Sequence, residues 1–235
     1  MTIRATIIPL EWESDFFQQP SGKLNFSEQA PVLSSSDLQK YRIVQAKIPA
    51  QNPALADDLA LFGFRLVEGE VDLALSIDAQ PGKSFSSINA RIAMPEDIHA
   101  LRAAAASAFA LSRFRAPWYQ ADDSGRFYAQ WAEKAVLGTF DHQCLIVHDD
   151  AGQPQGFVTL RDLGDGEARI GLLAVWPGAA GKGAGTKLMS VAKQWCMDKQ
   201  LRCLRVATQM GNIAALRLYI RSGASIESTA YWLYR

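Results

Sequence analysis

The chain has 235 residues, 49% of them hydrophobic and 20% charged, which is typical of a globular protein and excludes a collagen, a coiled coil or a disordered tail. Lys plus Arg and Asp plus Glu each total 24, so the overall charge indicates neither a nucleic-acid nor an anionic-membrane partner. Cys144, Cys196 and Cys203 lack C-x-x-C spacing, which argues against a disulfide framework and against a metal site.

The first residues carry no readable targeting signal. No apolar run with a cleavage site precedes Trp12 and Glu13. The longest weakly polar run, residues 170–181, is shorter than the roughly 20 residues that a membrane-spanning helix needs. We therefore expect a cytoplasmic protein without membrane insertion.

The N-terminal part, residues 1–85, is predicted to be a small α/β unit. Strands are predicted over residues 2–10, 23–26, 41–47 and 71–77, and helices over residues 34–38 and 54–62. Residues 80–89, QPGKSFSSIN, are rich in Pro, Gly and Ser without apolar periodicity. We therefore place a boundary there, between this unit and a larger domain over residues 90–235.

The larger domain is predicted to have the element order β-α-α-β-β-β-α-β-α-β. Its helices are predicted over residues 95–110, 124–136, 183–198 and 212–222, and its main strands over residues 143–148, 157–161, 168–175, 203–208 and 225–234. Short turns separate the first three of these strands, which predicts an antiparallel meander.

A faint repeat connects the two parts of the chain. Asn52 and Gly63 are 11 positions apart, as are Asn212 and Gly223, and each pair brackets a predicted helix between two strands. We hypothesise that the two units share an ancestor. The first copy has Leu59 where the second has Tyr219.

Positive charge is concentrated near the C-terminal end. Residues 169–221 contain nine Lys or Arg and a single acid, Asp198, a balance that would attract a polyanionic small molecule. Taken alone, this run is more typical of a solvated basic face.

A glycine-rich stretch, PGAAGKGAGTKL over residues 177–188, joins a predicted strand to a predicted helix. Gly181, Gly183 and Gly185 would allow backbone amides to approach a phosphate at the positive end of the helix. The stretch is not a Walker loop, since Lys182 is followed by glycine, and its glycine spacing does not fit a dinucleotide fingerprint. The alternative is a flexible turn.

Three spaced motifs resemble the GNAT superfamily of N-acetyltransferases: Leu173-x-Val175-x-Pro177, the glycine stretch, and Asn212-x-x-Ala215-x-x-x-Tyr219-x-x-x-Gly223. The resemblance implies an α/β fold with a mixed, mostly antiparallel, splayed sheet and flanking helices. It also implies acetyl-CoA as co-substrate, with no metal. Cofactor contacts carry over to Leu173, Val175, Ala179, Ala180, Gly181, Lys182, Gly183, Ala184, Gly185 and Asn212. The family usually has Gln or Arg where Ala180 stands, so binding would depend on backbone amides and lysines.

The resemblance assigns catalysis to Tyr219, as the general acid that protonates the departing CoA thiolate. Tyrosine's reference pKa of about 10 keeps it protonated at neutral pH. The alternative is a tyrosine that only packs on an amphipathic helix, and Asn212 has an alternative as a simple helix cap.

A closer resemblance, to bacterial members of this family that acetylate nucleotide-linked amino sugars, extends over residues 112–119, 125–131, 138–144, 206–212 and 228–235. It implies a homodimer, a truncated acetyltransferase-like N-terminal unit, and a small-molecule acceptor that carries thymidine diphosphate. Such an acceptor needs fixed positive charge and aromatic faces, for which we select Arg113, Arg115, Trp118, Tyr119 and Tyr128. Phe127 and Trp131 are interpreted as core residues.

The general base is left open. An ammonium group must lose a proton before it attacks a thioester, and the spacing selects none of Glu68, Glu70, Asp141, His142 and Glu167, nor excludes a water relay. No nucleophilic cysteine is expected. Two other functions compete: the same chemistry on another nucleotide amino sugar or a protein amine, and a non-catalytic acyl-CoA sensor.

Overall fold

The computed structural model describes residues 2–77 and 88–235, and its described strands form one ten-stranded sheet. The order across the sheet is β1-β2-β3-β10-β4-β9-β8-β7-β6-β5. The strands are β1 (Ala5–Pro9), β2 (Ser21–Phe26), β3 (Ile43–Pro49), β4 (Arg65–Ser76), β5 (Ala90–Ile92), β6 (Gln143–His148), β7 (Pro154–Gly164), β8 (Glu167–Val175), β9 (Cys203–Gln209) and β10 (Ser225–Tyr234). The helices are α1 (Glu11–Phe17), α2 (Ser35–Leu38), α3 (Pro53–Leu61), α4 (Ile98–Ala108), α5 (Asp123–Val136), α6 (Ala184–Asp198) and α7 (Ile213–Arg221), with a 3₁₀ turn at Pro95–Asp97.

The predicted elements are present with shifts of up to three residues at their ends, apart from β4, whose start at Arg65 lies six residues before the strand predicted over residues 71–77. The predicted antiparallel meander is confirmed as β6, β7 and β8. The sequence analysis did not predict α1. Its signal was present: Glu11 and Glu13 lie in the first turn, and Trp12 and Phe16 are four residues apart on one helix face. The predicted boundary at residues 80–89 lies mostly outside the described residues.

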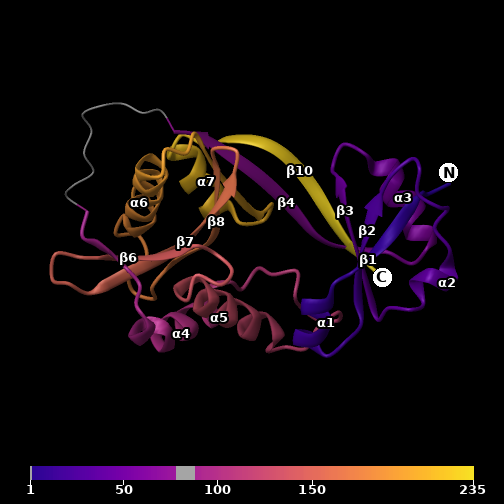
Figure 1. Cartoon of the computed structure of the whole chain (residues 1–235), viewed down its shortest axis with the longest axis horizontal. Helices are drawn as coiled ribbons and strands as arrows, with labels where there is room; N and C mark the ends of the chain where they lie inside the picture. Colours follow the sequence, from indigo (N-terminus) through magenta and orange to yellow (C-terminus); the bar gives the residue numbers. More distant parts are fainter. Residues whose placement is uncertain (1, 78–87) are drawn as a thin grey trace.

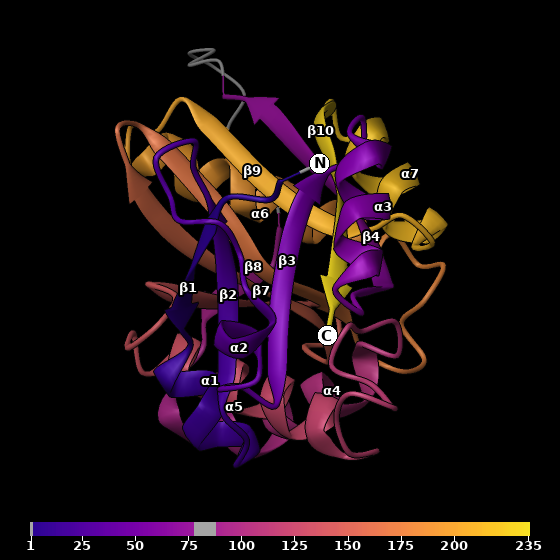
Figure 2. The ribbon, with the colours of Figure 1, turned by 90° about the vertical axis from the view of Figure 1, so that its right-hand side faces the viewer.

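The two halves of the chain interleave in the sheet. The C-terminal strand β10 lies between β3 and β4 of the N-terminal half, and β4 in turn lies between β10 and β9 of the C-terminal half. Figure 1 shows β4 and β10 as the long strands that connect the two sides of the molecule. Figure 2, turned toward the N-terminal side, shows β1, β2 and β3 together in front. The halves therefore share a sheet.

The predicted repeat has a structural counterpart around this exchange. Asn52 caps α3 by accepting from Leu55 N at 3.2 Å, and Asn212 caps α7 by accepting from Ala215 N at 3.2 Å. Gly63 and Gly223, just beyond the two helices, both have positive φ, 85° and 97°, which favours glycine. In the order β3-β10-β4-β9, the units β3-α3-β4 and β9-α7-β10 therefore occupy equivalent places.

Helices cover both faces of the C-terminal half (Figure 1). One apolar cluster packs residues of α6 and α7 on β4, β8 and β9, and a second packs α4 and α5 on the other face of β6, β7 and β8. A third cluster lies within the N-terminal half and includes Leu233 from β10. The shared strand thus contributes to the N-terminal core.

Strands β8 and β9 separate partway along their length. They pair in parallel from Glu167–Cys203 to Ile170–Val206, yet β8 continues to Val175 and β9 to Gln209 with no further pairing among the described residues. The splayed sheet implied by the family resemblance is therefore present. It leaves β8 backbone beyond Ile170 open on its β9 side.

Candidate active site

A cavity of about 490 Å³ lies at the point where β8 and β9 separate. Its lining comes from both faces of the sheet: Asn212, Leu218 and Tyr219 from α7, and Phe127, Tyr128 and Trp131 from α5. Since α7 and α5 cover opposite faces, the cavity passes through the sheet. Two ligands that enter from opposite faces would meet in it.

Tyr219 lies on α7 with its side chain 5% exposed, and it lines this cavity. Burial raises the pKa of its phenol. Within residues 2–77 and 88–235, its hydroxyl has no hydrogen-bond partner. Asn212 also lines the cavity while its side chain caps α7, so the two roles weighed for it in the sequence are compatible.

A β-bulge shapes the wall that β8 contributes. Gly171 and Leu172 together oppose Thr159 of β7, and the extra residue inverts the facing of the strand. Ile170 packs in the α6–α7 cluster, whereas Leu172 packs in the α4–α5 cluster. Leu173 consequently packs against the α6–α7 cluster, as Val175 does, and both line the cavity.

Asp141 fills the space beneath the bulge. Its side chain is 0% exposed and accepts from Trp131 Nε1 at 2.7 Å, Thr159 Oγ1 at 2.6 Å and Arg161 Nε at 3.0 Å. Thr159 Oγ1 in turn accepts from Leu172 N at 2.8 Å. A buried carboxylate with these donors is a structural group that fixes the bulge and Arg161.

We expect Gly171→Ala to destabilise the protein by about 1–3 kcal/mol, a typical cost of overpacking. A Cβ at this position would meet Asp141 Oδ2 and, at 2.8 Å, Thr159 Oγ1. Thermal and denaturant unfolding would measure the loss. Gly211→Ala is the matched control, because a Cβ there meets nothing within 4 Å. Equal stability of the two variants would contradict this account of the bulge.

The glycine stretch before α6 has the features of an anion site. Gly178, Gly181 and Gly183 have φ of 86°, 77° and 78°, and a Cβ on any of them would meet nothing within 4 Å, so backbone conformation is what requires glycine there. The first-turn amides of α6, at Ala184 and Gly185, have no intrahelical acceptor. These amides point their positive end at the loop.

The remaining residues of this stretch differ in exposure. Ala179 and Ala184 are 3% exposed, so only their backbones could contact a ligand, whereas Ala180, Gly181 and Lys182 are exposed. None of residues 177–185 lines the cavity itself. A Cβ on Gly185 would lie 3.0 Å from Leu218 Cδ2, and Leu218 does line it. The loop thus lies beside α7 at one end of the cavity.

Of the five residues selected for the acceptor, the structure brings two to the cavity, Arg113 and Tyr128. Arg113 donates to Gln45 Oε1 at 3.1 Å and to Tyr234 Oη at 2.5 Å, and its guanidinium lies 4.1 Å from the ring centre of Trp232. These contacts hold a cation at the cavity wall.

The other three selected residues do not line this cavity. Arg115 is exposed and donates to Val67 O at 3.1 Å. Trp118 packs edge-on against Tyr234 at 5.7 Å. Tyr119 is 5% exposed and its ring lies 4.5 Å from that of Phe17 on α1. It belongs to an aromatic core that could not be foreseen while α1 was unpredicted.

Conversely, Phe127 and Trp131 line the cavity although the sequence analysis interpreted them as core residues. Both interpretations hold in part, since Phe127 is 8% exposed and belongs to the α4–α5 cluster, against which Trp131 packs. The sequence analysis missed Arg161, Arg169 and Trp232, which also line it. They lie on strands, where the alternation of side chains predicts which residues share a face of the sheet. It does not predict whether that face contacts a helix or a ligand cavity.

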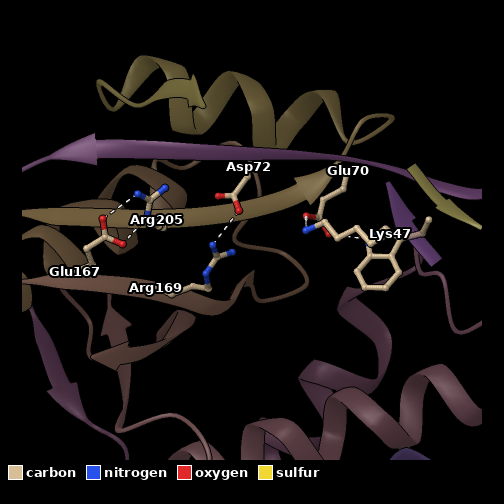
Figure 3. A network of polar contacts seen from close by, with 7 residues as sticks. Lys47, Glu70, Asp72, Glu167, Arg169 and Arg205 are labelled. Carbon is tan, nitrogen blue, oxygen red and sulfur yellow. Dashed lines mark hydrogen bonds and ion pairs between the residues drawn. The ribbon is translucent and has the colours of Figure 1, made fainter. Parts of the chain in front are cut away.

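The structure separates the candidate bases. Figure 3 shows a row of ion pairs across β8, β9, β4 and β3. Arg205 binds Glu167 through two contacts of 2.7 and 2.8 Å, Arg169 binds Asp72 at 2.9 Å, and Lys47 binds Glu70 at 2.6 Å. Arg205 lowers the pKa of Glu167 through these hydrogen bonds. Glu167 does not line the cavity.

Glu70 and Glu68 both line the cavity, but their pKa values are shifted in opposite directions. Lys47 and Trp232 Nε1, the latter at 2.8 Å, hydrogen-bond Glu70, and its pKa is lowered although burial opposes this. Burial raises the pKa of Glu68 to about 7, with a smaller contribution from Glu70. Glu68 is therefore the carboxyl that can change protonation near neutral pH.

The other candidates have structural contacts. Asp141 is enclosed as described, and His142 Nδ1 accepts from Asp162 N at 2.9 Å. Burial raises the pKa of the Cys144 and Cys196 thiols to about 12, which disfavours thiolates. The part of the chain that the structure describes contains no group of His, Cys, Asp and Glu arranged to hold a metal ion.

The described residues also include no helix that is both long and apolar enough to cross a membrane.

The chain is similar to known acetyltransferases in sequence. The Acetyltransferase (GNAT) family matches residues 105–224, which include α5, the β6–β8 meander, β9 and α7. The chain is 53% identical over 235 residues to the dTDP-fucosamine acetyltransferase of Escherichia coli O6:H1, covering 100% of each chain.

Solved structures share the fold. A GCN5-related N-acetyltransferase from Kribbella flavida superposes with a TM-score of 0.61 at 18% identity, covering 99% of this chain and 89% of that chain. A tandem GNAT protein from the clavulanic acid biosynthesis pathway superposes with a TM-score of 0.60 at 14% identity, covering 92% and 74%. The tandem architecture parallels the two interleaved halves seen here.

Proposed function

Since the chain belongs to the GNAT acetyltransferase family, we propose that it transfers the acetyl group of acetyl-CoA to the 4-amino group of dTDP-4-amino-4,6-dideoxy-D-galactose, also called dTDP-fucosamine. The observation that carries the proposal is the 53% identity over the full length to an acetyltransferase named for this substrate. The cavity, whose lining comes from both faces of the sheet, supports it, because transfer between two ligands requires their ends to meet.

We infer that acetyl-CoA enters from the α6–α7 face. The pantetheine arm would lie along β8 at Leu173 and Val175, where the strand has separated from β9. The pyrophosphate would bind the amides of residues 179–185 and the positive end of α6, with Lys182 adding charge. Asn212 would border the arm from the start of α7.

The amino sugar would enter from the α5 face. Arg113 and Tyr128 stay in the proposed acceptor site, where Arg113 supplies the fixed charge that a diphosphate needs. Arg115, Trp118 and Tyr119, which the sequence also suggested, do not line the cavity, so we propose no contact from them. Trp232 and Trp131 provide the apolar walls for a deoxysugar.

The proposed reaction proceeds in one ternary complex. The ammonium group gives a proton to the Glu68 carboxylate, directly or through one water, and the free amine forms a C–N bond to the thioester carbonyl carbon. The second proton that this nitrogen must lose leaves to water as the tetrahedral adduct collapses to the amide. A β8 backbone amide between Leu173 and Val175 polarises that carbonyl. As the C–S bond breaks, Tyr219 protonates the thiolate, and solvent returns the proton to Tyr219 while Glu68 releases its own.

The proposed function predicts thiol release from acetyl-CoA when the purified protein receives the galacto amino sugar. The 4-epimer, with its amine on the other side of the ring, and a lysine peptide are the comparison acceptors. We expect a rate at least about tenfold lower for each, since loss of fit at one buried amine costs more than 1.4 kcal/mol. A thiol-reactive dye measures the rates. Equal rates for all three would reassign the acceptor, and acetyl-CoA binding without turnover on any would favour an acyl-CoA sensor.

The resemblance also motivates three wider expectations. We propose that the protein is a homodimer, that it acts in the cytoplasm, and that its product enters enterobacterial common antigen biosynthesis. Sedimentation equilibrium tests the dimer. A competing function is the same chemistry on another nucleotide amino sugar, which the acceptor panel separates.

A further inference from the structure

A second cavity, of about 570 Å³, lies beside the first between α1 and α5. Arg113, Phe127 and Trp131 line both cavities, so these three side chains form the partition between them. The second cavity is bounded on its other side by α1 residues of the N-terminal half, including Glu11, Trp12 and Glu13. The acetyl-transfer step described above makes no use of this second cavity.

Two large aromatic side chains in this cavity are exposed. Trp12 is 42% exposed and Phe140 is 44% exposed, although both pack edge-on against the partition: Trp12 on Phe127 at 5.8 Å and Phe140 on Trp131 at 5.2 Å. Their edges are therefore fixed. The Trp12 ring also stacks on Phe16 at 5.1 Å, and Lys134 Nζ lies over it at 4.7 Å from the ring centre. A flat heterocycle that stacks on Trp12 therefore takes the place of the flexible lysine side chain.

Charges of both signs line the second cavity. Arg113 stands at the partition and Lys134 lies 4.7 Å from the Trp12 ring centre, whereas Glu11 and Glu13 line the α1 side. Gln45 connects Arg113 to Glu13, because it donates to Glu13 Oε2 at 2.6 Å and accepts from Arg113 at 3.1 Å. A fitting ligand has an anionic centre and a flat end with hydrogen-bond donors.

We propose that the cavity between α1 and α5 binds the pyrimidine nucleoside of the acceptor, with its diphosphate at Arg113 and its sugar in the active-site cavity. The inference rests on the proposed function and extends it. In the nucleotide sugar the diphosphate lies between the nucleoside and the sugar. In the protein Arg113 lies between the two cavities and lines both of them. Trp12 supplies the stacking face, and the carboxylates of α1 accept hydrogen bonds from the base N–H or the deoxyribose hydroxyl.

This assignment gives the N-terminal half a role in specificity. That half has Leu59 where Tyr219 stands in the other, so it lacks the proposed acid. It nevertheless places α1 against α5, through Phe16 and Phe17, each about 6 Å from Phe127. The N-terminal half would therefore supply one wall of the acceptor site.

The test compares Trp12→Ala, Trp12→Phe and the control Leu61→Ala, whose side chain is 85% exposed in the same half of the chain. For Trp12→Ala we expect a roughly tenfold higher KM for the nucleotide sugar and a roughly tenfold higher dissociation constant for dTDP, measured by calorimetry. Trp12→Phe should recover most of the affinity, and KM for acetyl-CoA should stay unchanged in all three.

Two further measurements isolate the nucleoside. Methyl 4-amino-4,6-dideoxygalactoside lacks the nucleotide, so wild type and Trp12→Ala should acetylate it equally, and inorganic pyrophosphate should inhibit both equally. Unchanged dTDP affinity in Trp12→Ala would overturn the inference, as would an equal loss with the methyl glycoside. A change of association state without a change of dTDP affinity would also overturn it and assign the surface to a contact between copies.

Failure of the proposed function gives a different pattern. If the wild type acetylates no nucleotide sugar yet binds dTDP, and Trp12→Ala weakens that binding, the nucleoside subsite stands and only the amino sugar is wrong. If the wild type acetylates the sugar and Trp12→Ala matches it in every measurement, the subsite is wrong and the function stands.

Discussion

Tyr219→Phe is expected to lower kcat by about 10²- to 10⁴-fold while leaving the affinity for acetyl-CoA unchanged, since this is the usual contribution of a positioned general acid. Phenylalanine keeps the ring that fills the space at 5% exposure and removes only the hydroxyl. Steady-state kinetics and calorimetry with acetyl-CoA measure the two quantities.

The physical reason lies in the burial of Tyr219. Burial raises the pKa of its phenol above the ordinary value of about 10, so the group is protonated at neutral pH. A thiolate leaving in the same cavity is equally deprived of water, which raises its own basicity. In the proposed reaction the hydroxyl would meet the departing sulfur as a proton donor, without a competing partner among the described residues.

Tyr231→Phe provides the matched control, because it removes a hydroxyl from a half-buried tyrosine in the N-terminal core. Its kcat should equal that of the wild type. If Tyr219→Phe also turned over at the wild-type rate, the thiolate would leave without help from Tyr219 and the acid assignment would be withdrawn. A loss of acetyl-CoA affinity with unchanged kcat would assign Tyr219 to binding instead.

The local geometry of the proposed cofactor side could be predicted from the sequence, because this side is formed by neighbouring residues. Asn212, Tyr219 and the glycine stretch lie within two strand-to-helix connections, where short-range spacing determines which side chains and amides meet. The capping of α7 by Asn212 and the positive φ of Gly223 beyond the helix obey the same local rules. These parts of the fold need little information from distant residues.

The acceptor side could not be predicted in the same way, because it is assembled from distant segments. Glu68 and Arg113 line one cavity although one lies on β4 and the other precedes α5. Their approach depends on β4 inserting between β9 and β10, which no local pattern reveals. Trp118 and Tyr119 have the right chemistry for a ligand, yet α1 and Tyr234 occupy their faces. Aromatic composition therefore overestimated their role.

Glu68→Gln is expected to lower kcat/KM at pH 7 by about 100-fold and to remove the rise of kcat/KM with pH near 7. The wild-type profile should rise there because burial raises the pKa of Glu68 to about 7, and only its ionised form accepts the ammonium proton. A rise at higher pH, from the substrate's own ammonium group, should remain in the variant. Glu28→Gln, at an exposed position, should retain the wild-type profile.

A pH titration of stability separates this role from a structural one. The folded-state pKa of Glu68 lies above its ordinary value of 4.5, so the folded protein holds the proton more tightly than the unfolded chain. Its contribution to stability is complete below pH 4.5 and is lost as the pH rises through about 7. Glutamine stays neutral, so Glu68→Gln should gain stability relative to wild type between pH 5 and pH 8.

Activity and stability should therefore change in opposite directions when Glu68 is replaced at pH 8. If Glu68 only completed the packing, its replacement would lower activity and stability together. A base held in an unfavourable environment instead destabilises the fold in its ionised form, which is the form that catalysis needs. Neighbouring Glu70, fixed by Lys47 and Trp232, has its pKa lowered, which distinguishes the two carboxylates of β4. If Glu68→Gln kept the wild-type rise of kcat/KM near pH 7, Glu68 would not be the base, and the ammonium proton of the substrate would pass to water alone.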